Sequence, residues 1–169
     1  MSKSYLNIQS LPRGLRNNNP GNIVFNNNNA WTGKISYQLN KDYNGSPSNI
    51  VRHFEQFNEV RYGLRALMRV IISYHNQGKR SVIEIINRYA PAFENNTGQY
   101  IATVANMVGI AATAAIPTLD KSTLIGLCKA IVYVENGNGY QGYITEADYN
   151  EAFSILGLPI PDQKKKTKQ

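Results

Sequence analysis

Cysteine, histidine and tryptophan are all scarce in this sequence of 169 residues, and their scarcity excludes several kinds of chemistry. The single cysteine, Cys128, has no partner in the chain for a disulfide, and its place on an apolar helix face predicts a small core residue. The only histidines, His53 and His75, have neither a second cysteine nor an acidic cluster beside them. We therefore expect no metal site and no cofactor.

Long apolar runs are also absent. No segment approaches the roughly 20 apolar residues that span a bilayer, and the first ten residues, MSKSYLNIQS, lack the apolar core of a signal peptide. If the protein acts outside the cytoplasm in which it is made, we expect another factor to carry it there.

Charge is sparse and unbalanced, because 17% of the residues are charged and yet the formal net charge is +7. This excess predicts attraction to an anionic polymer such as nucleic acid, an anionic membrane surface or bacterial cell-wall material. No recognition motif accompanies the basic residues, so we expect no specific nucleic-acid binding.

Length and hydrophobic content predict one folded domain over residues 1–160. A basic, disordered tail follows over residues 161–169. A membrane, a wall polymer and another protein are the alternatives for what this tail contacts.

The sequence LIGLCKAIVYVENGNGYQGY, residues 124–143, predicts an apolar helix that ends in one glutamate. Glu135 lies one helical row beyond Leu127 and Ile131, so it shares their buried face. Apolar surroundings and the negative end of the helix dipole disfavour a charged carboxyl, and we expect the pKa of Glu135 to be raised. A protonated carboxyl suits donation of a proton to a glycosidic oxygen. The alternative is a glutamate that turns to solvent or caps a neighbouring backbone N–H.

Helical periodicity recurs through most of the remaining chain. One helix begins at Val60 and ends near Asn76, and Ser81 with Glu84 has the spacing of a capping box for the next. Further helices are expected over residues 100–108 and 145–156. The turn signal YNGS, residues 43–46, predicts one small β-hairpin. The fold class is therefore mainly α, with at most one small hairpin.

Asparagine-rich and aromatic positions supply the candidate ligand contacts. The turn cluster RGLRNNNPGNI, residues 13–23, offers a row of amides that suits a sugar, and a structural loop is the alternative. Trp31 could be a platform for a sugar face or a core residue. In the loop PAFENNTGQY, Glu94 is flanked by Tyr89 and Tyr100, for which helix capping and core packing are the alternatives. The candidate substrate contacts are Asn18, Asn19, Asn22, Trp31, Tyr89, Glu94 and Tyr100.

Four motifs occur in order along the chain: RGLRNNNPGNI, GLRALMRVIISYHNQG, INRYAPAFENNTGQYIATV and AIVYVENGNGY. With them the sequence resembles, over roughly residues 14–156, a family of phage-encoded virion proteins of lysozyme-like character. The resemblance implies a lysozyme-like α+β domain that is made in the host cytoplasm, carried in the phage virion and active at the bacterial cell wall. Its implied partners are bacterial peptidoglycan and other virion proteins. Such proteins look like peptidoglycan-degrading enzymes related to lytic transglycosylases and bacterial glucosaminidases, and many are structural components of the particle.

The order of the motifs differs from that of lysozyme-like enzymes, in which the helix with the catalytic glutamate comes early and a polar turn and hairpin follow it. Here the helix that ends in Glu135 comes late. The resemblance therefore implies a circular permutation, in which residues 124–135 supply the catalytic helix and the start of the chain supplies the turn and hairpin. This hypothesis requires Glu135 to lie close to residues 17–22.

Glu135 is accordingly the predicted catalytic residue. No second carboxylate is obvious, which favours a lytic transglycosylase, with one residue acting as acid and then as base, over a hydrolysing muramidase or glucosaminidase. Glu55, Glu59 and Glu94 are the candidates for a second carboxylate. A non-catalytic virion protein that binds peptidoglycan or capsid partners is the alternative function. A nucleic-acid-packaging protein would rest on net charge alone.

Overall fold

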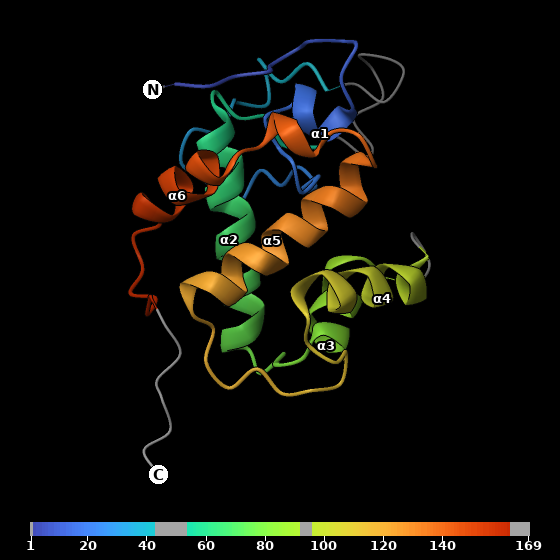
Figure 1. Cartoon of the computed structure of the whole chain (residues 1–169). Coiled ribbons are helices and arrows are strands. Elements are labelled where there is room, and N and C mark those ends of the chain that lie inside the picture. The colour runs from blue at the N-terminus through green and yellow to red at the C-terminus, as the bar shows by residue number, and fades with distance from the viewer. Residues whose placement is uncertain (1, 43–53, 92–95, 163–169) are drawn as a thin grey trace. The chain divides into compact units, whose positions relative to one another are not determined.

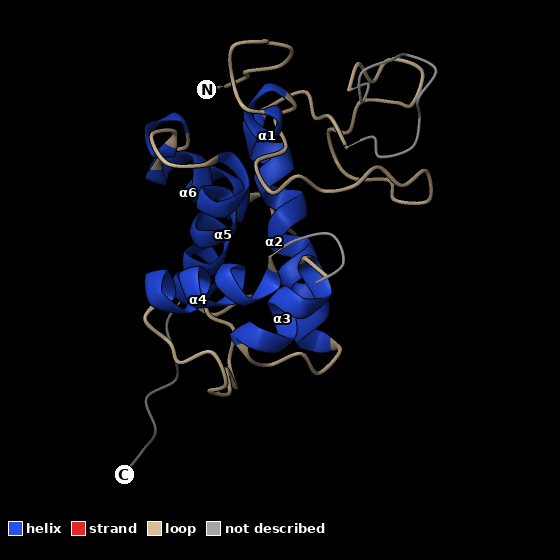
Figure 2. Ribbon diagram, turned by 90° about the vertical axis from the view of Figure 1, so that its right-hand side faces the viewer, coloured by secondary structure: helices blue, strands red, loops and turns tan. Residues whose placement is uncertain are grey.

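The computed structural model describes residues 2–42, 54–91 and 96–162. The chain divides into two compact units, the first formed by Met1–Leu67 and Glu135–Leu156 and the second by Met68–Val134 and Gly157–Gln169. The boundary falls inside two helices, α2 (Val60–Asn76) and α5 (Lys121–Asn136). Figure 2 shows helices and loops but no strand in the described part of the chain.

The first unit contains two short helices, α1 (Arg13–Arg16) and α6 (Glu146–Ser154), together with the 3-10 helix η1 (Gln141–Tyr143) and residues 60–67 of α2. Gly63 on α2 lets the asparagine-rich turn approach the helix closely, because a Cβ there would overlap the carbonyl oxygen of Asn18. The fully buried large side chains of this unit are Leu15, Phe57, Leu64, Leu67 and Leu156.

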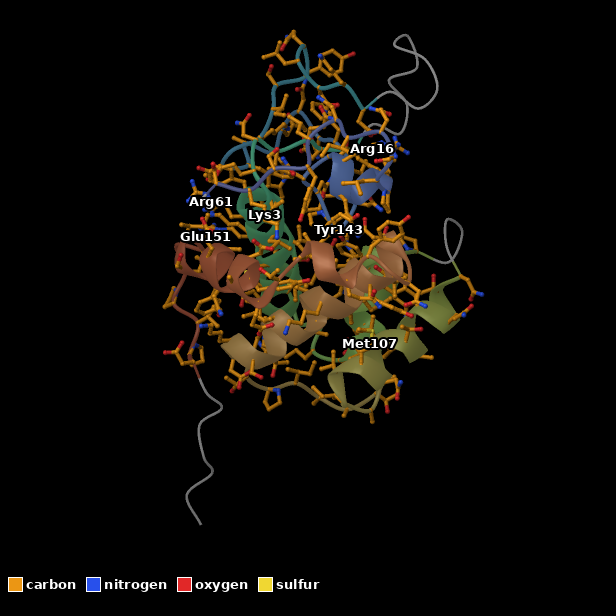
Figure 3. The ribbon with its side chains drawn as sticks, turned by 45° about the horizontal axis from the view of Figure 1, so that its top comes forward. Lys3, Arg16, Arg61, Met107, Tyr143 and Glu151 are labelled. Carbon is orange, nitrogen blue, oxygen red and sulfur yellow. The ribbon has the colours of Figure 1, made fainter. Side chains whose placement is uncertain are left out.

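Ion pairs and a cap hold α6 within the first unit. Thr145 and Asp148 form a reciprocal capping box at its start. The same Asp148 carboxylate accepts from Lys3 Nζ at 2.7 Å, which fastens the N-terminal arm to this helix. Arg61 on α2 lies beside Glu151 on α6, as Figure 3 shows, with 3.2 Å between nitrogen and oxygen.

The second unit contains α3 (Val82–Tyr89) and α4 (Thr97–Val108), which lie side by side in Figure 1, with residues 68–76 of α2 and 121–134 of α5. Cys128 is fully buried, as predicted, and burial raises the pKa of its thiol. The other large, fully buried side chains are Met68, Ile71, Ile85, Ile86, Leu124, Leu127 and Ile131.

Polar residues cap the starts of the helices in the second unit, and the cap at Ser81 was predicted from the sequence. The Ser81 hydroxyl accepts from the backbone N–H of Glu84 and donates to its carboxylate, so the cap of α3 is confirmed. The Asp120 carboxylate accepts from the backbone N–H of Thr123 at 2.8 Å in the first turn of α5. Asn96 caps α4 in the same way through Gln99.

The prediction of a mainly α fold is confirmed, and α2 has the bounds that periodicity indicated. The hairpin expected at residues 43–46 lies outside the described residues, as do residues 163–169 of the expected tail. Two isolated antiparallel bridges, Val24 with Phe54 and Lys34 with Phe57, are present instead of a ladder in the part that is described. The single domain stays a prediction. Across residues 2–42, 54–91 and 96–162, no helix has both the length and the apolar character needed to cross a bilayer.

Candidate functional site

The asparagine-rich turn, residues 17–22, is held to the first unit by its own side chains. Asn18 Nδ2 donates to the carbonyl oxygen of Phe57 and to the hydroxyl of Ser4, both at 2.9 Å. Its Oδ1 accepts from the backbone N–H of Tyr5 at 2.8 Å. The side chain therefore replaces backbone partners that a loop of this shape would otherwise lack.

Asn19 has a similar role. Its Nδ2 donates to the carbonyl oxygens of Ile23 and Glu55, at 2.9 and 3.0 Å, and its Oδ1 accepts from the backbone N–H of Ile23. Asn18 and Asn19 are both 0% exposed. Both side chains are therefore buried and use their amide groups inside the fold, as the structural-loop alternative expects, and their contact with substrate stays a prediction.

Asn22 differs from its two neighbours because its amide reaches the end of α5. Its Nδ2 donates to Oε1 of Glu135 at 2.9 Å, a contact that joins residues 113 positions apart in the sequence. Both side chains are partly exposed, and the backbone of Asn22 has the left-handed φ of 53° that asparagine tolerates. The closeness of Glu135 to the asparagine-rich turn, which the permutation hypothesis required, is thus observed within the first unit.

The residue after Glu135 strengthens this connection. Asn136 Nδ2 donates to the carbonyl oxygen of Pro20 at 2.8 Å. Gly14 on α1 makes room for both contacts, since a Cβ there would lie 2.5 Å from Asn136 Oδ1 and 3.1 Å from Asn22 Oδ1. Two consecutive residues at the end of α5 are therefore bonded to one turn.

Glu55, a candidate second carboxylate, is 0% exposed and forms an ion pair with Lys34 at 3.0 Å. Burial raises the pKa of Glu55, and the hydrogen bond and charge of Lys34 only partly oppose that effect. The Lys34 ammonium also donates to the carbonyl oxygens of Asn26 and Asn29. Glu55 is thus closed off in a polar cluster of its own.

The other two candidates for a second carboxylate are Glu59 and Glu94. Glu59 forms an ion pair with Arg61 at 3.0 Å, and that guanidinium also contacts Glu151. Glu94 lies outside the described residues.

The aromatic candidates are divided between the units. Trp31, in the first unit, is partly exposed, and its buried indole N–H has no hydrogen-bond partner among the described residues. Tyr100 on α4 is 4% exposed and belongs to the core of the second unit, as the core-packing alternative expects, and a contact with substrate stays a prediction. Tyr89, the last residue of α3, is partly exposed and belongs to that second unit as well.

Comparison with known proteins identifies a relative from a phage. No family model matches the chain. Protein P5 of Pseudoalteromonas phage PM2 is 34% identical over 137 residues, which cover 80% of this chain and 78% of that protein. The chain belongs to the protein P5 family. The predicted link to phages is supported by this relative, whereas lysozyme-like character stays a prediction.

This P5-family chain also has a cluster of three tyrosines that was not predicted from its sequence. The rings of Tyr5 and Tyr143 meet edge to face with centroids 5.4 Å apart, and Tyr140 lies 5.9 Å from Tyr143. The Tyr5 hydroxyl donates to the carbonyl oxygen of Tyr143 at 2.7 Å, and Tyr143 itself is exposed (Figure 3). The sequence feature that could have indicated this cluster is the pair of tyrosines in GYQGY, which follows Glu135 and its turn.

The arrangement around Glu135 can carry out proton transfer. A partly exposed carboxyl with one oxygen fixed by an amide can give up and regain a proton at a defined position. Within the described residues, no group of three or more histidine, cysteine, aspartate or glutamate side chains could hold a metal ion.

Proposed function

We propose that this protein cleaves the glycan strand of bacterial peptidoglycan in the manner of a lytic transglycosylase, with Glu135 as its acid and base. The observation that carries the proposal is the hydrogen bond from Asn22 to Glu135. It joins the end of an apolar helix to the asparagine-rich turn, the two segments in which the sequence pattern placed acid and sugar-binding chemistry.

The proposed fold is a lysozyme-like domain in circularly permuted order. The contacts from Glu135 to Asn22 and from Asn136 to Pro20 support it, because they bring a helix late in the chain to a turn near its start. A small hairpin after that turn belongs to the same proposal.

The proposed reaction needs one carboxyl. Protonated Glu135 donates to the glycosidic oxygen as the bond from that oxygen to the anomeric carbon breaks, and the departing sugar keeps the bonding electron pair. A hydroxyl of the remaining sugar then attacks the anomeric carbon, its proton returns to Glu135, and an anhydro sugar forms. The ion pairs of Glu55 with Lys34 and of Glu59 with Arg61 support this scheme over hydrolysis, because both candidates are engaged elsewhere.

The proposed setting is the phage virion, with peptidoglycan and other virion proteins as partners. The phage relative supports this setting. The net charge of +7 suits attraction to anionic wall polymers, and contact of the lysine-rich tail with a membrane is part of the same proposal.

The test is digestion of purified sacculi, followed by mass spectrometry of the soluble products. Wild type should release anhydromuropeptides, and Glu135→Gln should lower the rate by roughly 100-fold or more, because glutamine keeps the shape but cannot donate that proton. Glu84→Gln is the matched control, since Glu84 is exposed and glutamine can still accept from Ser81.

Each outcome decides between functions. Undiminished release by Glu135→Gln would dismiss Glu135, and products with reducing ends would indicate hydrolysis with a second carboxylate. Saturable binding to sacculi without any products would favour a non-catalytic virion protein.

A further inference from the structure

The hydrogen bond between Asn22 and Glu135 has a direction, and that direction assigns separate tasks to the two carboxyl oxygens. Asn22 Nδ2 donates and Oε1 of Glu135 accepts. We propose that Asn22 is a positioning residue that holds Oε1, so that Oε2 carries the proton that is transferred. This inference rests on the proposed glycan cleavage and names a residue that the reaction would need in addition to Glu135.

The direction follows from the groups present. Once Glu135 has given up its proton, its carboxylate only accepts hydrogen bonds, so at that stage an amide turned the other way would set its oxygen against another acceptor. Accepting an N–H occupies a lone pair of Oε1, so in the neutral form of Glu135 the proton is placed on Oε2. The proton and the hydrogen bond thus use different oxygens.

The same contact survives the whole proposed cycle. When Oε2 gives its proton to the glycosidic oxygen, Glu135 becomes a carboxylate and Oε1 still accepts from Asn22. The bond then strengthens, because hydrogen bonds to charged acceptors are shorter and stronger than neutral ones. When the attacking hydroxyl returns a proton to Oε2, the starting geometry is restored without movement of the side chain.

The surroundings of Asn22 fit positioning better than support of the fold. Its other amide atom, Oδ1, is buried and has no hydrogen-bond partner among the described residues. Asn18 and Asn19 use both ends of their amides, and Asn17, whose Nδ2 also has no partner among the described residues, directs its Oδ1 to Gln56 inside the fold. A buried polar atom left unsatisfied calls for an explanation. Placement of Nδ2 on Glu135, with Gly14 leaving space for Oδ1, provides one.

The first variant to make is Asn22→Gly, which keeps the left-handed backbone and removes the donor. Asn7→Gly is the matched control, because Asn7 has a φ of 62°, is exposed and also makes a side-chain hydrogen bond, to Gln56. Using solubilised glycan strands, we expect Asn22→Gly to lower kcat by roughly tenfold to a hundredfold, the effect of misplacing a reacting group. Its KM and its binding to sacculi should stay within about twofold of wild type, as should every value for Asn7→Gly.

The outcomes separate the two proposals. Activity in wild type that Glu135→Gln loses and Asn22→Gly keeps would overturn the positioning role while leaving glycan cleavage intact. A rise in KM with unchanged kcat would also overturn it, since Asn22 would then be a substrate contact. No products from wild type would refute glycan cleavage and the inference together.

Nuclear magnetic resonance tests the direction without activity. The two side-chain amide protons of Asn22 should shift as Glu135 titrates, and this shift should disappear in Glu135→Gln while the side-chain amide of Asn7 behaves alike in both proteins. Amide protons of Asn22 that ignore Glu135 would overturn the assignment of Oε1 as the fixed oxygen.

Discussion

A substitution at Gly63 tests how the asparagine-rich turn is held, because α2 and the turn meet there without a side chain between them. A Cβ at Gly63 would overlap the carbonyl oxygen of Asn18 and lie 2.8 Å from its carbonyl carbon and 3.2 Å from Cα of Asn19. These are backbone atoms, so no change of rotamer relieves the overlap. We therefore expect Gly63→Ala to destabilise the protein.

Two effects of opposite sign set the magnitude. Alanine in a helix interior gains about 1 kcal/mol over glycine. Overpacking costs about 1–3 kcal/mol or more, and displacing Asn18 weakens side-chain hydrogen bonds worth about 1 kcal/mol each. The net loss in the free energy of unfolding is about 2–4 kcal/mol, which for a chain of this length lowers Tm by roughly 5–15 °C.

The assay is thermal and urea unfolding of Gly63→Ala beside Gly126→Ala, a matched glycine inside α5. A Cβ at Gly126 meets only the side chain of Val108, at 3.9 Å, so this control should gain up to about 1 kcal/mol. The reasoning is refuted if Gly63→Ala is as stable as wild type or gains as much as the control.

Two further predictions concern pH. Burial alone would raise the pKa of Asp42, but hydrogen bonds from Arg13 and the backbone N–H of Phe54 hold it below 3.8, so this pair stabilises above the unfolded-state pKa and loses its effect as pH falls through the folded-state value. Arg13→Gln should therefore cost about 2–3 kcal/mol at pH 7 and progressively less in urea titrations as the pH falls through the folded-state pKa of Asp42, and equal losses at every pH would contradict this. Burial raises the pKa of Glu55 above 4.5, so the native state binds that proton more tightly and stability falls as pH rises through the raised value. Glu55→Gln should lose this part of the pH dependence, and an unchanged slope in the same titrations would count against it.

Helix positions were predictable because their signals are local. The apolar periodicity of α2 and the cap residue Ser81 act within one or two helical turns, so neighbouring residues carry the information. The end of α5 was predictable for the same reason, since Gly137 and Gly139 both take positive φ just after Asn136.

The tasks of the asparagines were not predictable, because their partners are distant in sequence. Asn18 bonds to a residue 39 positions away, Asn19 to one 36 away and Asn22 to one 113 away. Asn17 Oδ1 likewise accepts from Gln56 Nε2, 39 positions away. The four asparagines of one turn therefore divide into three that build the fold and one that reaches Glu135. A pattern of amides in the sequence indicates that hydrogen bonds can form, and the tertiary structure determines their partners.

The choice of hydrogen-bond partner also bears on which acid can exchange a proton. Asp42 is held by a guanidinium that favours the charged carboxylate and so resists protonation. Glu55 takes a lysine partner while fully buried, where a polymeric substrate has no access. Oε1 of Glu135 instead accepts from a neutral amide, and an amide N–H can be accepted by the acid and by its carboxylate alike. A group that serves first as acid and then as base must keep its place in both forms, and partial exposure must let substrate reach it. Glu135 is partly exposed, and its hydrogen bond from Asn22 can be kept in both forms, which is what the proposed role requires.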